Sequence, residues 1–383
     1  MNSHCKFQEW GFDDGFKSET AACHDHLAQS YLLDRLYTSP DTTKDSQHCN
    51  PTDHDLPTLQ RHNFIKTCAF PTNISIIYFI VAHKHPNMLQ RLLNRLSEDT
   101  SFLLLVHIDE HATEAFSNEV KRLVQAPNRC LVRYGSIVYF TASILEAMTA
   151  AFKWALKANT QWSHLITLTG QDYPLFHPHT IRKRVLEVGN FTWYPDFSTC
   201  IESDFCRCVQ NPSSHPEFHR MKTFGFPCAN KTLKFAVTLP RNPWIFSNHA
   251  DYKLDYFCKT YPMTSAVWAR RTVHYLTHDP IAIASYAFFH RSYCAVEEHF
   301  WPSLLWSKVR EHLHIQTPCM MSWDIGVGEG GTKASIDNTH NTFLTMNEKE
   351  FILTAHKYGS LFARKFSVEF DSAILDYIDS LVG

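Results

Sequence analysis

The sequence lacks the features that would assign it to a membrane or to nucleic acid. No stretch approaches the ~20 apolar residues that span a bilayer, and residues 1–15 have neither the charged start nor the apolar centre of a signal peptide. There is no long run of lysine or arginine, and the formal net charge is -2, which gives no electrostatic reason to expect nucleic acid as a partner. We therefore expect a cytoplasmic protein without a transmembrane segment, and leave peripheral association with a membrane open.

Two motifs are present only in part. Cys206 and Cys208 form a CxC, but no second pair stands at zinc-ligand spacing, which argues against a structural zinc. The chain has 12 cysteines and no secretory signal, so we expect reduced thiols. The glycine-rich segment 326–331, GVGEGG, lacks a following GK[ST] and is interpreted as a surface loop, not a phosphate loop.

Composition divides the 383 residues into two parts. Residues 1–70 are polar, with a linker-like stretch at 39–56, and we interpret them as an appendage. Residues 71–383 hold the long apolar runs, and 44% hydrophobic residues overall suffice for a sizeable core. Within this domain residues 191–244 are proline-rich and irregular, as is typical of a functional lid or binding wall, so we assign them to the acceptor side.

The domain opens with an apolar strand, an amphipathic helix and a second apolar strand. Ile76 to Ala82 is rich in β-branched and aromatic residues, Pro86 starts a helix with leucines at helical spacing, and Phe102 to Ile108 is the second strand. This βαβ pattern predicts an α/β fold with a mostly parallel sheet. Ligands of such sheets bind at the carboxyl ends of strands, so His83 and its neighbours and Asp109 are candidate site residues.

The pattern continues along the chain. We expect further helices or strands over residues 114–125, 130–132, 143–156, 164–168, 264–278, 281–290, 295–309 and 347–382.

Six separated segments resemble one family in the same order. They are VAHKHPNMLQRLL (81–93), VHID (106–109), LITLTGQDYPL (165–175), TSAVWARRTVHYL (264–276), VEEHFWPSLL (296–305) and LFARKFS (361–367). Together they resemble the core-2/I-branching β-1,6-N-acetylglucosaminyltransferases, glycosyltransferase family 14, which also contains the peptide O-xylosyltransferases. The resemblance implies a GT-A type fold, a Rossmann-like sheet that binds a UDP sugar with a glycan or glycoconjugate acceptor beside it, and an inverting branching reaction.

The resemblance also implies roles for single residues. His83 and Asp109 match the nucleotide pocket, and Lys365 matches the basic residue that meets the diphosphate. Glu298 matches the catalytic carboxylate, and an inverting transfer needs one base to take the proton of the acceptor hydroxyl. The residues alone leave a plainer alternative open, in which Glu297 and Glu298 only favour a helix N-terminus.

No metal or other cofactor is expected to be required, because Arg364 and Lys365 can supply positive charge to the leaving diphosphate. The alternative is a metal held by His107, Asp109 and His111, which share a strand face. The further arginine with which core-2 type members grip the diphosphate is absent here. His340 stands in the comparable stretch, and Lys333 is a further candidate cation.

Three more residues are candidates for the acceptor side or for orienting the site. Asp172 follows a buried strand and orients the site, binds an acceptor hydroxyl or caps a turn. Trp323 stacks on an acceptor sugar or belongs to the core, and Ser265 is the third candidate. Ala266 replaces the acidic residue that xylosyltransferases tend to have there, which favours an N-acetylhexosamine donor without excluding xylose.

The sequence thus predicts a glycosyltransferase that moves a sugar, most simply GlcNAc, from a UDP sugar to a glycan hydroxyl with Glu298 as base. Three alternatives stay open: a xylosyltransferase, a metal-dependent hydrolase that uses His107, Asp109, His111 and Glu298, and a glycan-binding protein without turnover. A chelator distinguishes the hydrolase, and Glu298→Gln distinguishes the binding protein.

Overall fold

Strand β1 (Ile76–Ala82) lies inside the central sheet of the computed structural model. The structure describes residues 73–135, 137, 142–158, 161–195, 207–210, 223–228, 231–236, 254–260, 264–289, 296–321 and 343–382. Strand β1 pairs in parallel with β2 (Phe102–Ile108) on one side and with β4 (His164–Thr169) on the other. β3 (Arg129–Val132) extends the sheet in parallel, and β11 (Val267–Ala269) adds an antiparallel edge. The strand order is β11-β4-β1-β2-β3.

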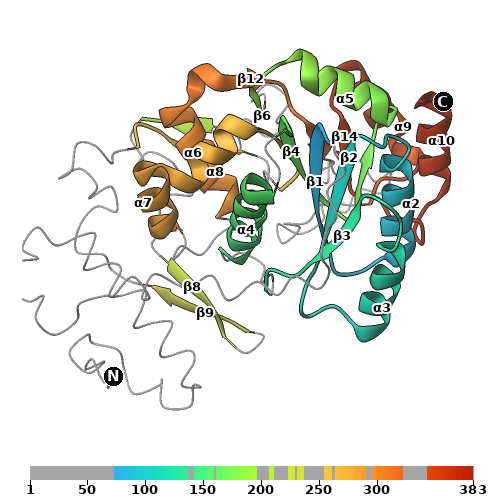
Figure 1. The fold of residues 1–383 in the computed structure, drawn as a ribbon, viewed down its shortest axis with the longest axis horizontal. Coiled ribbons are helices and arrows are strands. Elements are labelled where there is room, and N and C mark those ends of the chain that lie inside the picture. Colours follow the sequence, from blue (N-terminus) through green and yellow to red (C-terminus); the bar gives the residue numbers. More distant parts are fainter. Residues whose placement is uncertain are drawn as a thin grey trace, which may run out of the picture.

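Helices cover both faces of this sheet. Their bounds are α2 (Pro86–Leu96), α3 (Glu114–Leu123), α4 (Ser143–Ala158), α5 (Pro178–Glu187), α6 (Arg270–His278), α7 (Pro280–Phe289), α8 (Glu297–Lys308), η8 (Arg310–His312), η9 (Met346–Glu348), α9 (Lys349–Lys357) and α10 (Ala373–Val382). Helices α4, α6, α7 and α8 lie on one side, and α2, α3 and α10 lie on the other (Figure 1).

Alternate residues of β1 explain why both faces are covered. Ile77 and Phe79 pack in the core with α4, α6 and α8, whereas Ile76, Tyr78 and Ile80 pack in the core with α2, α3 and α10. Side chains of a strand alternate between the two faces of its sheet, so a strand apolar at every position must be covered on both.

Short strands build smaller sheets around the central one. They are β5 (Asp172–Pro174), β6 (Thr192–Tyr194), β7 (Arg207–Val209), β8 (Thr223–Cys228), β9 (Lys231–Ala236), β10 (Phe257–Lys259), β12 (Leu313–Ile315), β13 (Cys319–Met321) and β14 (Phe362–Arg364). The sheet β13-β14-β5 matters most for the site, because its register places Arg364 opposite Asp172.

The predicted α/β class, with a Rossmann-like, mostly parallel sheet flanked by helices, is confirmed. Residues 191–244 are less irregular than expected, since β6, β7, β8 and β9 fall within their described part. The appendage at residues 1–70 and the glycine-rich loop at 326–331 lie outside the described residues. Among the helices that are described, none has the length and apolarity needed to cross a membrane.

The expectation of reduced thiols is wrong for Cys130, Cys208 and Cys258, which are disulfide-bonded. Cys208 on β7 forms a disulfide with Cys258 on β10, and the two strands pair antiparallel at this position. Cys208 is therefore unavailable as a zinc ligand, whereas Cys319 is a free and buried thiol. The pairing escaped the sequence reasoning because spacing does not reveal which of many cysteines are partners.

Candidate active site

Asp109 shapes the edge of the site at the end of β2. Its carboxylate is 6% exposed and accepts hydrogen bonds from the backbone N–H of His111 (2.7 Å) and of Ile137 (2.8 Å). The imidazole Nδ1 of His111 lies 3.2 Å from the same carboxylate. Asp109 thus ties the loop after β2 to the segment after β3. An ionised carboxylate has about four lone-pair positions, so it can still accept from a ligand hydroxyl.

The ends of β1 and β4 meet next to this edge. The N–H of Gly170 donates to the carbonyl of Val81 at 2.8 Å. A Cβ at position 170 would stand 3.2 Å from the Cβ of Ala82, tighter than an ordinary van der Waals contact, so the close approach of the two strand ends favours glycine. This packing brings the turn that carries Asp172 toward the loop that carries His83.

Basic groups gather where β1 and β14 end. The imidazole of His83 reaches the surface, but the surrounding protein lowers its pKa by loss of solvation; Lys84 and Lys365 lower it further, and Asp109 opposes them. Half-buried Lys365 also has a lowered pKa, first through burial and then through the charges of Lys84 and Arg364. Lys84, one of the neighbours of His83 that the sequence offers as candidates, belongs to this cluster. Such a concentration of cations suits an anionic ligand.

Phe343 lies between the loop after β1 and the loop after β14. The ammonium of Lys365 stands 4.8 Å from the centre of its ring, and the imidazole of His85 meets it edge-on at 5.7 Å between ring centres. Glu369 joins the same two loops through an ion pair of 3.3 Å with His85. His85 itself has a φ of +59°, a left-handed conformation that a non-glycine residue rarely adopts. These contacts fix the loop that carries His83 and Lys84.

Asp172, Ser265 and Arg364 form a buried network, so three of the predicted residues are brought together. The Asp172 carboxylate accepts from the Ser265 hydroxyl (2.7 Å) and from the N–H and hydroxyl of Thr169 (2.7 and 3.1 Å). The Arg364 guanidinium lies 3.4 Å from it and 3.5 Å from the Ser265 hydroxyl. Burial raises the pKa of Asp172, and Arg364 acts against that rise. Asp172 therefore both caps a turn and orients Arg364.

The two glutamates that open α8 have different partners. The Glu298 carboxylate is 10% exposed and lies 3.9 Å from the ammonium of Lys259 on β10. Burial raises the pKa of Glu297 to about 7, and the positive charge of Arg364 acts against that rise. Consecutive residues of a helix point in different directions, which accounts for the difference. Neither the approach of Lys259 to Glu298 nor the environment of Glu297 has a signal in the sequence.

The alternative metal ligands do not come together among the described residues, where no group of three or more His, Cys, Asp or Glu side chains is arranged to hold a metal. The ring of His107 is fully buried beside Phe79 and Tyr134, and burial lowers its pKa to about 4. Its Nδ1 accepts from the backbone N–H of Tyr134 at 3.2 Å. Metal independence stays a prediction. Trp323, Lys333 and His340 lie outside the described residues.

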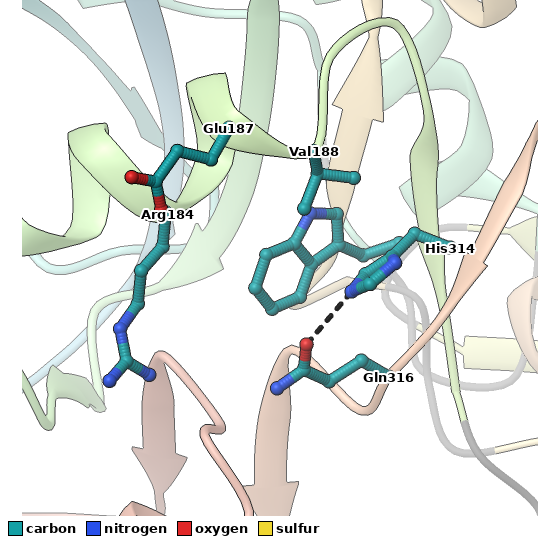
Figure 2. Close-up of a pocket in the computed structure, with 6 residues that line it drawn as sticks. Arg184, Glu187, Val188, His314 and Gln316 are labelled. Carbon is teal, nitrogen blue, oxygen red and sulfur yellow. Dashed lines mark hydrogen bonds between the residues drawn. The ribbon is translucent and has the colours of Figure 1, made fainter.

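A separate pocket of about 280 Å³ opens at the other end of β14. It is lined by Arg184, Glu187, Val188, Trp193, His314 and Gln316 (Figure 2). His314 and Gln316 are joined by a hydrogen bond of 2.9 Å, and the Gln316 amide donates to the carbonyls of Tyr358 and Gly359. These bonds fasten the turn that precedes β14, so we interpret this pocket as structural.

The geometry can now be compared with known proteins. Residues 76–191 match the family model of the Core-2/I-Branching enzyme. This part of the chain is therefore similar to the Core-2/I-branching enzymes. The match runs from β1 to the segment after α5, so the Core-2/I-branching region includes His83, Asp109 and Asp172. Glu298, Arg364 and Lys365 lie beyond it, and their roles are proposals.

The curated relatives that the chain matches are N-acetylglucosaminyltransferases. It is 23% identical over 239 residues to mouse beta-1,3-galactosyl-O-glycosyl-glycoprotein beta-1,6-N-acetylglucosaminyltransferase 4, covering 60% of this chain and 46% of the relative. It is 30% identical over 102 residues to human N-acetyllactosaminide beta-1,6-N-acetylglucosaminyl-transferase, covering 26% of this chain and 25% of the relative. The chain thus spans less than half the length of these relatives.

Among solved structures, core-mannan synthase A from Aspergillus fumigatus is similar over 67% of this chain and 76% of its own, at 6% identity and a TM-score of 0.31. A TM-score in this range carries no argument about the present chain, so the fold rests on the strand order described above.

Proposed function

We propose that this chain is an inverting glycosyltransferase that moves GlcNAc from UDP-GlcNAc to a hydroxyl of a glycan acceptor. The observation that carries the proposal is the convergence of strand ends and cations: His83 and Asp109 follow β1 and β2, and Lys365 follows β14 within the electrostatic reach of His83. The Core-2/I-branching match over 76–191 and the curated relatives support the reaction class.

In this proposal Glu298 is the general base. Its carboxylate takes the proton of the acceptor hydroxyl as the oxygen attacks the anomeric carbon from the face opposite the nucleotide. The bond from the anomeric carbon to the diphosphate breaks, and its electron pair leaves with UDP. One positioned carboxylate contributes typically ~10²- to 10⁴-fold.

The developing charge on the diphosphate would be stabilised by Lys365, with Lys84 and His83 nearby. The Arg364 guanidinium pairs with the buried Asp172 carboxylate. We therefore assign two roles to Arg364: it stabilises the buried network beneath the site, and it contacts the ligand. No metal is required in this scheme, because the cation cluster takes the place of a divalent ion at the leaving group.

The test is a donor screen that measures nucleotide release with UDP-GlcNAc, UDP-GalNAc and UDP-xylose in the presence of glycan acceptors, with and without EDTA. We expect turnover with UDP-GlcNAc, no effect of EDTA, and a loss of at least about 100-fold in Glu298→Gln. The matched control is Glu311→Gln, which removes a carboxylate from η8 and should leave the rate unchanged.

Other outcomes point elsewhere. Preference for UDP-xylose would identify a xylosyltransferase, and loss of activity in EDTA would favour the metal-dependent hydrolase. Glycan binding that is unaffected in Glu298→Gln, without any nucleotide release, would identify a binding protein. If no nucleotide sugar raises the melting temperature, the transferase proposal fails.

A further inference from the structure

Strand β10 is fastened to α8 by two serines one helical turn apart. The hydroxyl of Ser303 accepts from the N–H of Cys258 (2.8 Å) and lies 3.3 Å from its carbonyl. The hydroxyl of Ser307 makes the same two contacts with Tyr256, at 3.0 and 3.3 Å. The free edge of a strand is thereby satisfied by helix side chains at i and i+4, which lie on one face of the helix. This arrangement fixes the register of β10 along α8.

Two more links hold the strand at its far edge and at its end. On the edge away from the helix, Cys258 is joined to Cys208 by the disulfide within the β7–β10 pair. At the end of the strand, the N–H of Thr260 donates to the carbonyl of Glu298 at 3.1 Å. Lys259 lies between these two fixed points, so the backbone leaves it little freedom relative to the first turn of α8.

The charged side chains that face each other across this junction are both buried. The side chain of Lys259 is 6% exposed and that of Glu298 is 10% exposed, and their charged atoms lie 3.9 Å apart. Ionised groups are rarely buried unless they are paired, because each loses several kcal/mol of hydration. An opposite charge within about 4–6 Å favours the ionised form of a carboxyl group. The four links described above thus hold the ammonium of Lys259 next to the carboxylate of Glu298.

We propose that Lys259 is a positioning residue for the general base, and that the ladder between β10 and α8 serves to hold its ammonium against Glu298. Lys259 keeps the Glu298 carboxylate ionised and fixed in direction, ready to accept the proton of the acceptor hydroxyl. This inference rests on the proposed function, because it takes Glu298 as the base.

Other ionisable groups lie on α8, on the neighbouring α7 and η8, and on β14. They are Glu297 and His299 on α8, Tyr286 on α7, Arg310, Glu311 and His312 on η8, and Arg364 on β14, which acts on Glu297. An ion pair of 3.9 Å joins the Glu298 carboxylate to Lys259, so removing Lys259 tests what this pair contributes to the titration of the base.

The test compares Lys259→Met and Lys259→Arg by steady-state kinetics from pH 5 to 9 with UDP-GlcNAc as donor. In Lys259→Met we expect kcat to fall at least about 10-fold at pH 6, KM for the donor to change little, and the acid limb of the kcat profile to move up by at least about one pH unit. Lys259→Arg should retain the original acid limb, because it keeps the charge. The matched control is Lys308→Met. It removes a partly exposed ammonium, 3.5 Å from Asp255, from α8, the helix that carries Glu298.

The outcomes separate the two proposals. Activity that persists in Glu298→Gln refutes Glu298 as base and therefore the proposed mechanism. If Glu298→Gln is inactive but the acid limb of Lys259→Met coincides with that of the wild type and of Lys308→Met, only the role of Lys259 is overturned. If Lys259→Met fails to fold, the double variant with Glu298→Gln should fold better than the single variant, because it lacks the carboxylate that Lys259 faces at 3.9 Å; no improvement contradicts the pairing.

Discussion

Arg364 is the side chain whose removal tests the buried network most directly. Arg364→Met leaves the Asp172 carboxylate, 0% exposed, without the cation 3.4 Å away. Breaking a buried pair from one side costs about 3–5 kcal/mol, a large part of the ~5–15 kcal/mol that stabilises a typical domain. We expect the urea midpoint of Arg364→Met to fall accordingly at pH 7.

A second substitution should restore much of that loss. In Asp172→Asn the amide oxygen can keep the bonds from Ser265 and from the N–H of Thr169, which reach the same carboxylate oxygen. The amide nitrogen would then face Thr169 Oγ1 and, in the single variant, Arg364. In the double variant the guanidinium is gone, so the amide nitrogen no longer faces a cation. The two substitutions together should therefore lower the free energy of unfolding by about 2–4 kcal/mol less than the sum of their separate effects.

The pH dependence of the stability of Arg364→Met is an independent test of the pair between Asp172 and Arg364. Burial raises the pKa of Asp172, and Arg364 lowers it, so removing Arg364 raises the pKa further. A carboxyl group with a raised folded-state pKa binds more protons when folded than when unfolded, so it destabilises the fold as pH rises. The penalty of Arg364→Met should therefore be larger at pH 7 than at pH 5, and should shrink as the solution is acidified toward the ordinary aspartate pKa of about 4.

The measurement is urea unfolding followed by circular dichroism at pH 7 and pH 5 for the wild type, both single variants and the double variant. The control is Arg122→Met, which breaks an exposed pair with Glu119 on α3 and should leave the midpoint almost unchanged. Effects of Arg364→Met and Asp172→Asn that add within about 0.5 kcal/mol would refute the buried network as described.

Three further predictions concern other groups. Lys365→Met should lower kcat/KM for the donor by roughly 10- to 100-fold, or about 1.4–2.8 kcal/mol, with most activity kept in Lys365→Arg; because the Lys365 pKa is lowered, wild-type activity should decline on the alkaline side earlier than an ordinary lysine would allow. Replacing Cys208 and Cys258 by serine removes a crosslink between residues 50 apart, which should cost about 2–4 kcal/mol of stability, and a reductant should destabilise the wild type more than this variant, which keeps the disulfide of Cys130. Burial lowers the pKa of His107 from 6.5 to about 4, so the folded state binds fewer protons than the unfolded state in that window, and stability should fall by up to about 3 kcal/mol as pH drops from 6.5 to 4; His107→Phe should flatten this slope in urea unfolding.

The sequence predicts the central sheet well because its signals are local and long. β1 and β2 are seven-residue apolar runs, and the buried leucines of α2 recur at helical spacing. Strands β5 and β14 have three residues each, too short for a period of two to be visible. The small sheet that places Arg364 opposite Asp172 was therefore not predicted, although both residues were singled out as candidates.

The identity of residues that carry charge is visible in the sequence, but their pairing is not. Glu297 and Glu298 are adjacent and chemically alike, and only the fold shows that the charge of Arg364 acts on one and that Lys259 pairs with the other. Lys259 stands in a segment with no periodic signal, and its approach to Glu298 depends on the ladder from β10 to α8. The energy of a buried charge depends on a partner within a few ångströms, and that distance is set by tertiary packing. A sequence motif can therefore name a catalytic carboxylate, whereas the cation that keeps it ionised has to be found in the structure.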